Sequence, residues 1–354
     1  MPFRFFQRFR IAPGLRLNVS KGGVSLSAGP RGAQFTIGTS GTRATAGLPG
    51  TGLHYTVHNP HKKLFDSAAS SGVASAKTAA ASQPQAPRPG WLERVSMRGD
   101  DKDFIDGWQA WEAGDANAAL QKFTAVAPDS PAGADAAWSA AVLTAQRELF
   151  GQAMRLLARV LQKPARLGKT FESHGFRPKL QVWVTPQVQA LMVPTVSSVR
   201  LLLAELQQTE GDSAAALQTL GQALMCDGPA QSVDPVMLAA FGELATEVGE
   251  SDALHRFNTL AADIGNDTAV HTAVLFYRAK SLFDQQLFDA ALSVLTLALR
   301  RKKDRDPELL HDIRFLRGKT YQALNRRAQA RRDFERIYAE NPRFEGIRQA
   351  LGLT

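Results

Sequence analysis

Three histidines close to residue 60 have the clearest metal-like spacing in the chain. His54, His58 and His61 are four and three residues apart, which would bring their imidazoles, good zinc ligands, together on one helix. The residues around them instead alternate between apolar and polar types up to Asn59-Pro60, which predicts the end of a strand. Because this spacing does not converge on a strand, the sequence favours a solvated strand end, and no metal or cofactor is predicted.

Two glycine–lysine–threonine runs look like the end of a phosphate-binding loop. Gly168-Lys169-Thr170 and Gly318-Lys319-Thr320 supply the last three residues of that motif. The motif also requires a glycine five positions before its last glycine, where this chain has Lys163 and Ile313. We therefore interpret both runs as incidental.

The charged residues do not form a recognisable catalytic set. No serine–histidine–acid arrangement and no paired carboxylates stand out from the charged helix faces. A weaker alternative is an enzyme site around His174, Arg177 and Lys179. The sequence predicts a protein that is not an enzyme.

The carboxyl-terminal residues carry the strongest structural pattern. Gly318 and Ala330 are small residues at the expected crossing of two helices, and Tyr321 follows Gly318 by three positions. Phe334 fills the gap between the helices, and Pro342 ends the unit. Together these residues resemble one tetratricopeptide repeat, a helical hairpin of ~34 residues.

Similar offsets of small and large residues recur from Trp91 to the end of the chain. Each hairpin has one apolar side that only a stacked neighbour can bury, so an array is expected. The predicted fold class is mainly α, a tetratricopeptide-like α-solenoid of about six hairpins over residues 93–354, preceded by a small all-β meander domain. An irregular insertion at about 164–194 interrupts the array: its runs 180–186 and 188–193 are β-like, and a divergent helix pair joined by a long loop is the other interpretation.

The resemblance implies a concave wall made largely by the first helix of each pair. Aromatic and charged residues on these helices suit the capture of a peptide or a helix. The alternative is that the tryptophans cap the first repeat and the phenylalanines belong to the core. The predicted partner-binding residues are Trp108, Trp111, Glu205, Glu243, Phe276, Lys280, Phe283 and Lys319.

Residues 1–58 read as a small basic β domain. Apolar and polar residues alternate with period two, and glycine-rich turns interrupt them every eight to ten residues. The runs 12–25 and 47–53, with Tyr55, resemble domain-of-unknown-function family 4236. That resemblance implies a β module and assigns it no activity. Residues 59–92, rich in Ala, Ser and Pro, are predicted to be a linker.

Charge is divided along the chain. The net charge is +9, yet residues 1–65 contain nine Lys or Arg and no acid, residues 66–299 carry −7, and residues 300–354 carry +7. This division favours anionic partners at the ends, or an amino-terminal module that folds back on the acidic middle. The predicted anionic-surface residues are Arg4, Arg8, Arg10, Arg16, Lys21, Arg31 and Arg43.

The alternative function is association with nucleic acid through this module and the basic last repeat. In that repeat, Arg326-Arg327 and Arg331-Arg332 are interpreted mostly as solvated helix faces, with ion pairs such as Arg332 with Asp333. The β module offers no recognisable platform of aromatic residues for stacking bases. The leading hypothesis is therefore an interaction scaffold, whose array holds a protein or peptide while the basic module contacts a second, anionic surface.

Composition sets the remaining expectations. The chain has 354 residues, of which 44% are hydrophobic, enough for a substantial core. Its single cysteine, Cys226, excludes an internal disulfide and suits a reducing compartment. There is no apolar run of about 18 residues that would span a membrane, and the arginine-rich start lacks the apolar block of a secretory signal. A cytoplasmic protein is expected.

Overall fold

The computed structural model describes six amino-terminal strands, residues 99–226 and residues 233–353. For the amino-terminal strands the description concerns the backbone. The predicted linker and the positions of Arg4, Lys21, Arg31 and His61 lie outside the described residues.

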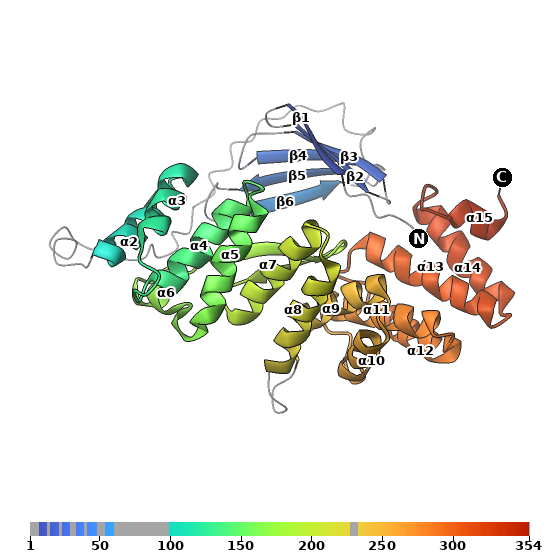
Figure 1. The fold of residues 1–354 in the computed structure, drawn as a ribbon. Helices are drawn as coiled ribbons and strands as arrows, with labels where there is room; N and C mark the ends of the chain where they lie inside the picture. Colours follow the sequence, from blue (N-terminus) through green and yellow to red (C-terminus); the bar gives the residue numbers. More distant parts are fainter. Residues whose placement is uncertain are drawn as a thin grey trace, which may run out of the picture.

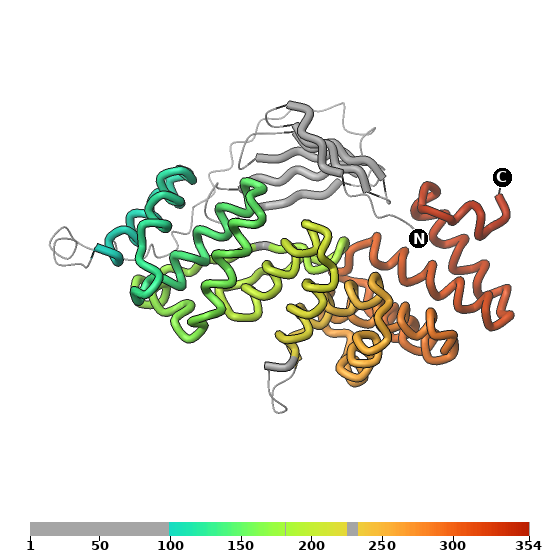
Figure 2. Tube along the Cα trace, viewed as in Figure 1, coloured from blue at the N-terminus to red at the C-terminus, as the bar shows by residue number. Residues whose placement is uncertain are grey.

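Residues 99–340 form six helical hairpins in chain order, so the expected mainly helical, tetratricopeptide-like solenoid is confirmed (Figure 1). Successive pairs follow one another along the tube of Figure 2, from blue to red. A short helix, α15 (Ile347–Leu351), packs on the last pair. The pairs are α2 (Gly99–Glu112) with α3 (Ala116–Ala125), α4 (Gly133–Ala145) with α5 (Phe150–Gln162), α7 (Val196–Thr209) with α8 (Ser213–Cys226), α9 (Pro235–Val248) with α10 (Ser251–Leu260), α11 (Ala269–Asp284) with α12 (Phe288–Ala298), and α13 (Pro307–Ala323) with α14 (Arg327–Glu340).

Helix starts follow from local capping chemistry. The carboxylate of Asp115 accepts hydrogen bonds from two backbone N–H groups at the start of α3. Asp234 and Asp306 cap α9 and α13 in the same way, each followed by a proline at the first helical position. Proline suits this position because the first helical N–H has no partner in the helix.

Three hairpins use a glycine to bring their helices together. A Cβ atom on Gly318 would lie 2.3 Å from Cε1 of Phe334, and one on Gly242 would lie 2.3 Å from Cε2 of Phe257. In the first hairpin, a Cβ atom on Gly107 would lie 2.9 Å from Cε1 of Phe123. The small residue of the first helix and the large residue of the second therefore form one interlocking contact.

Two large apolar clusters fill the array, and α7 contributes to both. Val199 and Leu206 belong to the cluster of the first two hairpins, whereas Leu201 and Ala204 belong to the central cluster formed with α8 to α13. The two clusters are therefore joined through one helix. A third, smaller cluster surrounds Phe334 between α13, α14 and α15.

Ion pairs stabilise the last hairpin from within. Arg317 donates two hydrogen bonds of 2.7 Å to the two carboxylate oxygens of Asp333. Asp333 therefore pairs with Arg317 of the neighbouring helix, and the predicted pair with Arg332 is wrong. The side chains of His311 and Arg314 are both bound to Glu340 Oε2, at 3.0 and 2.8 Å. Part of the positive charge in this repeat is thus neutralised internally.

The amino-terminal strands pair antiparallel in chain order as one six-stranded sheet. Their register follows the alternation of the sequence: Leu17 pairs with Leu26, and Leu26 with Ile37. The strands are β1 (Gln7–Ala12), β2 (Leu15–Ser20), β3 (Gly23–Ala28), β4 (Ala33–Gly38), β5 (Gly41–Gly47) and β6 (His54–Asn59). His54 and His58 fall on β6, about 13 Å apart at the usual rise of a strand.

The irregular segment between α5 and α7 forms a one-turn 3-10 helix, the short helix α6 (Lys169–Ser173) and a β-hairpin. The hairpin consists of β7 (Leu180–Thr185) and β8 (Val188–Met192), which pair antiparallel. The β-like runs correspond to these two strands, and the divergent helix pair, which was the favoured interpretation of the sequence, is wrong.

We expect Gly318→Ala to destabilise the array by about 1–3 kcal/mol, because the new methyl group overlaps the ring of Phe334. Urea unfolding followed by circular dichroism measures the change. The matched control is Gly151→Ala in α5, where the nearest atom to a new Cβ is the end of Arg155 at 3.8 Å. Equal stability of the two variants would contradict the proposed contact.

Candidate protein-binding surface

The β7–β8 hairpin covers first helices of the array. It contacts α9 through β7 and α11 through β8. At its turn, Gln187 Nε2 donates a 2.7 Å hydrogen bond to Asp312 Oδ2 on α13. One insertion therefore spans the first helices of three successive hairpins, on the side where the sequence predicted an open wall.

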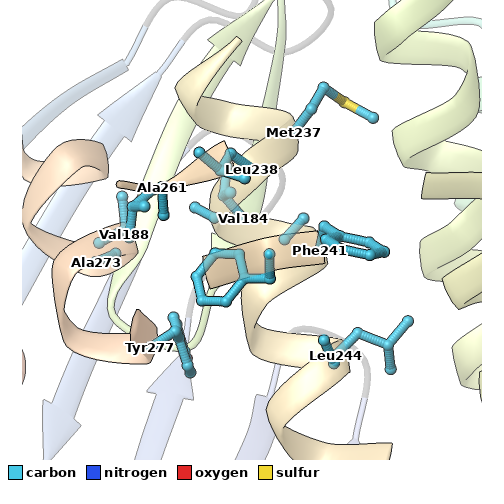
Figure 3. Packing of buried hydrophobic residues seen from close by; sticks show 14 of the residues in the cluster. Val184, Val188, Met237, Leu238, Phe241, Leu244, Ala261, Ala273 and Tyr277 are labelled. Atoms are coloured by element: carbon cyan, nitrogen blue, oxygen red, sulfur yellow. The ribbon is translucent and has the colours of Figure 1, made fainter. Parts of the chain in front are cut away.

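One face of the hairpin is part of the core. Val184 and Val188 are 1% and 2% exposed and belong to the central apolar cluster. Figure 3 shows both among Leu238, Ala273 and Tyr277, which come from α9 and α11. Burying two valines stabilises the folded chain by roughly 3–5 kcal/mol. The hairpin is therefore a fixed part of the surface.

The opposite face of the hairpin is exposed and apolar. Trp183, Leu191 and Val193 are 44%, 57% and 49% exposed. In the register of the hairpin Trp183 is opposite Gln189, and Leu191 lies diagonally beside it, opposite Gln181. We call these three side chains the hairpin patch. Large exposed hydrophobic residues elsewhere in the described part of the chain are isolated at Leu149, Val248, Leu287 and Leu353. An apolar cluster of this kind is a candidate contact surface.

Two predicted acids lie close together on neighbouring first helices. Glu205 of α7 and Glu243 of α9 interact electrostatically. Burial, and secondarily the charge of Glu243, raises the pKa of Glu205 to about 8. Sequence placed both residues on one wall, and the structure adds that burial and the nearby Glu243 keep Glu205 largely protonated at neutral pH.

The remaining residues predicted on the central and last hairpins have different surroundings. Phe276 is half-buried against the central cluster, and Phe283 packs edge-on against Phe288 of α12, at 5.3 Å between ring centroids. Lys280 is half-buried on α11. Lys319 is exposed, and its Nζ lies 4.9 Å from the ring centroid of Phe315. Of these four residues, the two lysines are the charged ones.

The two predicted tryptophans belong to an aromatic cluster at the first hairpin. Trp108 is 8% exposed and stacks on Phe176 at 5.1 Å between centroids, with Trp111 and Phe171 edge-on to it. Such burial leaves Trp108 unavailable for a partner and favours the alternative that it caps the first repeat. Trp111 is half-buried beside Trp138.

An internal carboxylate explains the Gly168-Lys169-Thr170 run. Asp135 is fully buried in α4, and its two oxygens accept hydrogen bonds from the backbone N–H groups of Gly168, Thr170 and Phe171 at 2.6, 2.8 and 3.1 Å. The start of α6 therefore binds an anion that belongs to the protein itself. Sequence reasoning missed this role, although one acid within an alanine-rich helix was a usable signal.

The three residues of the weaker enzyme alternative do not form a site. The ring of His174 lies against Phe176, at 6.0 Å between centroids, and Arg177 donates to the carbonyl oxygen of Phe176. Lys179 is exposed just before β7. These contacts are those of a connecting loop.

Three cavities in the described part of the chain lie away from the predicted residues. Those over α3–α5, α13–α15 and α10–α12 have volumes of about 350, 340 and 450 Å³, and none is lined by the eight predicted partner-binding residues. Within the described ranges there is no cluster of three or more potential metal ligands. In those ranges, too, every helix is too short or too polar to cross a membrane.

Comparison with known proteins identifies the amino-terminal segment. Residues 3–56 match a family described as a protein of unknown function (DUF4236), which confirms the resemblance seen in the sequence motifs. A search of curated proteins finds no match to this chain.

Solved structures resemble the chain at low identity. The amino-terminal domain of the EccA1 ATPase from the ESX-1 secretion system of Mycobacterium tuberculosis is 12% identical over 72% of this chain and 88% of that one, with a TM-score of 0.46. The apo form of RapI is 11% identical over 74% and 76%, with a TM-score of 0.44. A tetratricopeptide repeat protein from Parabacteroides merdae is 13% identical over 72% and 98%, with a TM-score of 0.33.

We expect Glu205→Gln to stabilise the protein increasingly as pH rises. The folded pKa lies above the model-peptide value of 4.5, so the folded state holds the proton more tightly and wild-type stability falls between about pH 4.5 and 8. The variant should be more stable than wild type by roughly 1–3 kcal/mol at pH 9 and equally stable at pH 4. Thermal unfolding across this range measures the difference, with Glu210→Gln at the exposed end of α7 as the control. A constant difference at every pH would contradict the raised pKa.

Proposed function

We propose that the protein is a non-enzymatic interaction scaffold whose helical array binds a protein or peptide partner. The observation that carries the proposal is the exposed apolar hairpin patch, on a hairpin that lies over first helices carrying charged side chains. Trp183 and Leu191 offer apolar area, Glu205 and Glu243 offer acidic groups, and Lys280 offers a positive charge. Exposed aromatic and aliphatic anchors with polar residues at the rim are typical of protein interfaces.

The shape of the cavities supports a macromolecular partner. The three cavities described above lie on other parts of the array, whereas the proposed surface extends over the first helices of three hairpins. A small molecule is usually held in a concave pocket that encloses most of its area. A broad and open surface suits a polypeptide. Of the eight sequence-predicted residues, we retain Glu205, Glu243, Phe276, Lys280, Phe283 and Lys319 as proposed contacts.

We propose in addition that the basic module binds a second, anionic surface. The sheet register places Arg10 directly opposite Arg16, and Arg43 directly opposite His58. Like charges at directly opposite positions destabilise a sheet, and an anion bound to that face offsets the repulsion. Arg8 is two residues from Arg10 on the same strand and therefore shares this face. We keep the cytoplasm as the proposed location.

The first test asks whether Lys280 and Lys319 contribute to binding of the protein partner. Proteins captured from cell extract by the wild-type chain should be recovered at least 10-fold less by Lys280→Glu/Lys319→Glu, because two attractive charges become repulsive. The control is Lys302→Glu/Lys303→Glu, which makes the same charge change in the exposed connection between α12 and α13. A shortened chain of residues 93–354 should capture the same partner. Equal capture by both double variants would contradict the proposed surface.

The second test concerns the basic face of the sheet. Binding of the full chain to phosphatidylserine vesicles should fall at least 10-fold in Arg10→Gln/Arg16→Gln/Arg43→Gln, since each arginine contributes about 1 kcal/mol at such a surface. The control removes three exposed arginines of the array, at positions 155, 159 and 327. Binding to duplex DNA with steep salt dependence, and none to vesicles, would instead favour the nucleic-acid function.

A further inference from the structure

The amino-terminal sheet has one apolar face that a single layer cannot bury. Its register places apolar residue types side by side across the strands: Leu17 with Leu26, Leu26 with Ile37, and Ala28 with Phe35. The pattern continues into the last two strands, where Ala44 pairs with Val57. A sheet with one apolar face must pack that face against another layer. The residues in this register are Phe9, Leu15, Leu17, Val19, Val24, Leu26, Ala28, Phe35, Ile37, Ala44, Tyr55 and Val57.

The array offers a matching layer. The hairpin patch, Trp183, Leu191 and Val193, is an exposed apolar face of a two-stranded antiparallel sheet. Because the other face of that hairpin is buried in the array, the patch is held in place before any contact forms. Two sheets pack face to face at a separation of about 10 Å, with side chains interdigitating.

We propose that the apolar face of the chain's own amino-terminal sheet docks on the hairpin patch and covers the proposed partner-binding surface. Six strands span about 24 Å across a sheet, enough to cover the hairpin and reach the adjoining first helices. The opposite face of the sheet, with Arg10, Arg16 and Arg43, then points away from the array. The module thus keeps its basic face free while its apolar face occupies the array.

Charge and chain length favour this occupant over another molecule. Residues 1–65 have nine basic residues and no acid, whereas residues 66–299 carry a net charge of −7. The attraction is therefore one between the net charges of the two parts, because Arg10, Arg16 and Arg43 lie on the face turned away from the array. A coil as long as residues 60–98 has an end-to-end distance of roughly 35 Å, which corresponds to a local concentration near the millimolar range. Even a weak contact is therefore populated within one chain.

Docking changes how the scaffold works. A protein partner of the array competes with the sheet for the hairpin patch, so the sheet acts as a cover that lowers the apparent affinity of the array. This inference goes beyond the proposed binding function and does not require it, since it predicts a contact within the chain that is measurable without a partner.

Hydrogen exchange of the full chain tests the contact. In Trp183→Ser/Leu191→Ser, amides of residues 15–59 should exchange at least 10-fold faster than in wild type, because the sheet loses its covering layer. The matched control is Leu149→Ser/Leu287→Ser, which removes two isolated side chains of similar exposure, 49% and 51%, at the starts of α5 and α12. Exchange in α9 and α11 should not change in either variant, which shows that the array remains folded.

Three results would overturn the proposal. They are equal exchange of residues 15–59 in wild type and the hairpin variant, no protection of these residues in wild type, and protection that increases with protein concentration. The last result would assign the cover to a second copy of the chain. If the first variant loses protection in α9, Leu191→Ser/Val193→Ser, which keeps Trp183, replaces it and has the same expected result.

Discussion

The close crossing of two helices inside each hairpin is the contact on which the array depends. Gly318 and Phe334 make it in the last hairpin, and Gly242 and Phe257 make it in the fourth. The crossing fixes the distance between the two helices and so sets the apolar face that the pair presents to the next one. Since a single pair cannot bury that face, stability comes from neighbouring pairs, and the order of pairs along the sequence becomes their order in space.

The β7–β8 hairpin adds a contact that this nearest-neighbour logic does not supply. Its buried face completes the central cluster, and its turn reaches α13 through Gln187 and Asp312. The same element therefore does two opposite things. The hairpin covers first helices that are exposed in an ordinary array. Its own exposed side chains, Trp183, Leu191 and Val193, provide an apolar surface in their place. In the proposed function, specificity for a partner depends on this insertion as much as on the repeats.

The periodic elements were predictable because their residues obey local rules. Gly318 and Phe334 predicted the last hairpin. The alternation of apolar and polar residues between Leu15 and Val57 predicted strands, and the observed register follows this alternation. The Gly242–Phe257 contact of the fourth hairpin was not predicted. Non-local partners could not be read in advance: nothing in the local sequence says that Asp333 faces Arg317 on the preceding helix and not its neighbour Arg332.

The candidate surface was only partly accessible to sequence reasoning for a similar reason. Glu205 and Glu243 were assigned to one wall from the repeat frame, but their mutual approach depends on how two helices pack. Trp108 was assigned there as well, yet α6 and Phe176 fold over it, and that fold-back depends on Asp135 binding the start of α6. Burial by a distant segment is a property of the folded chain and has no local pattern.

The hydrogen bond between Gln187 and Asp312 joins positions 125 residues apart. Helical repeat arrays are generally flexible, because each unit contacts only its neighbours and small rotations add up along the stack. Here the β7–β8 hairpin contacts α9, α11 and α13 on one side of the array. Bending that separates these three helices must therefore also break the contacts of the hairpin. The carboxyl-terminal half should therefore be stiff, and elastic deformation should concentrate at α7, where the two apolar clusters meet.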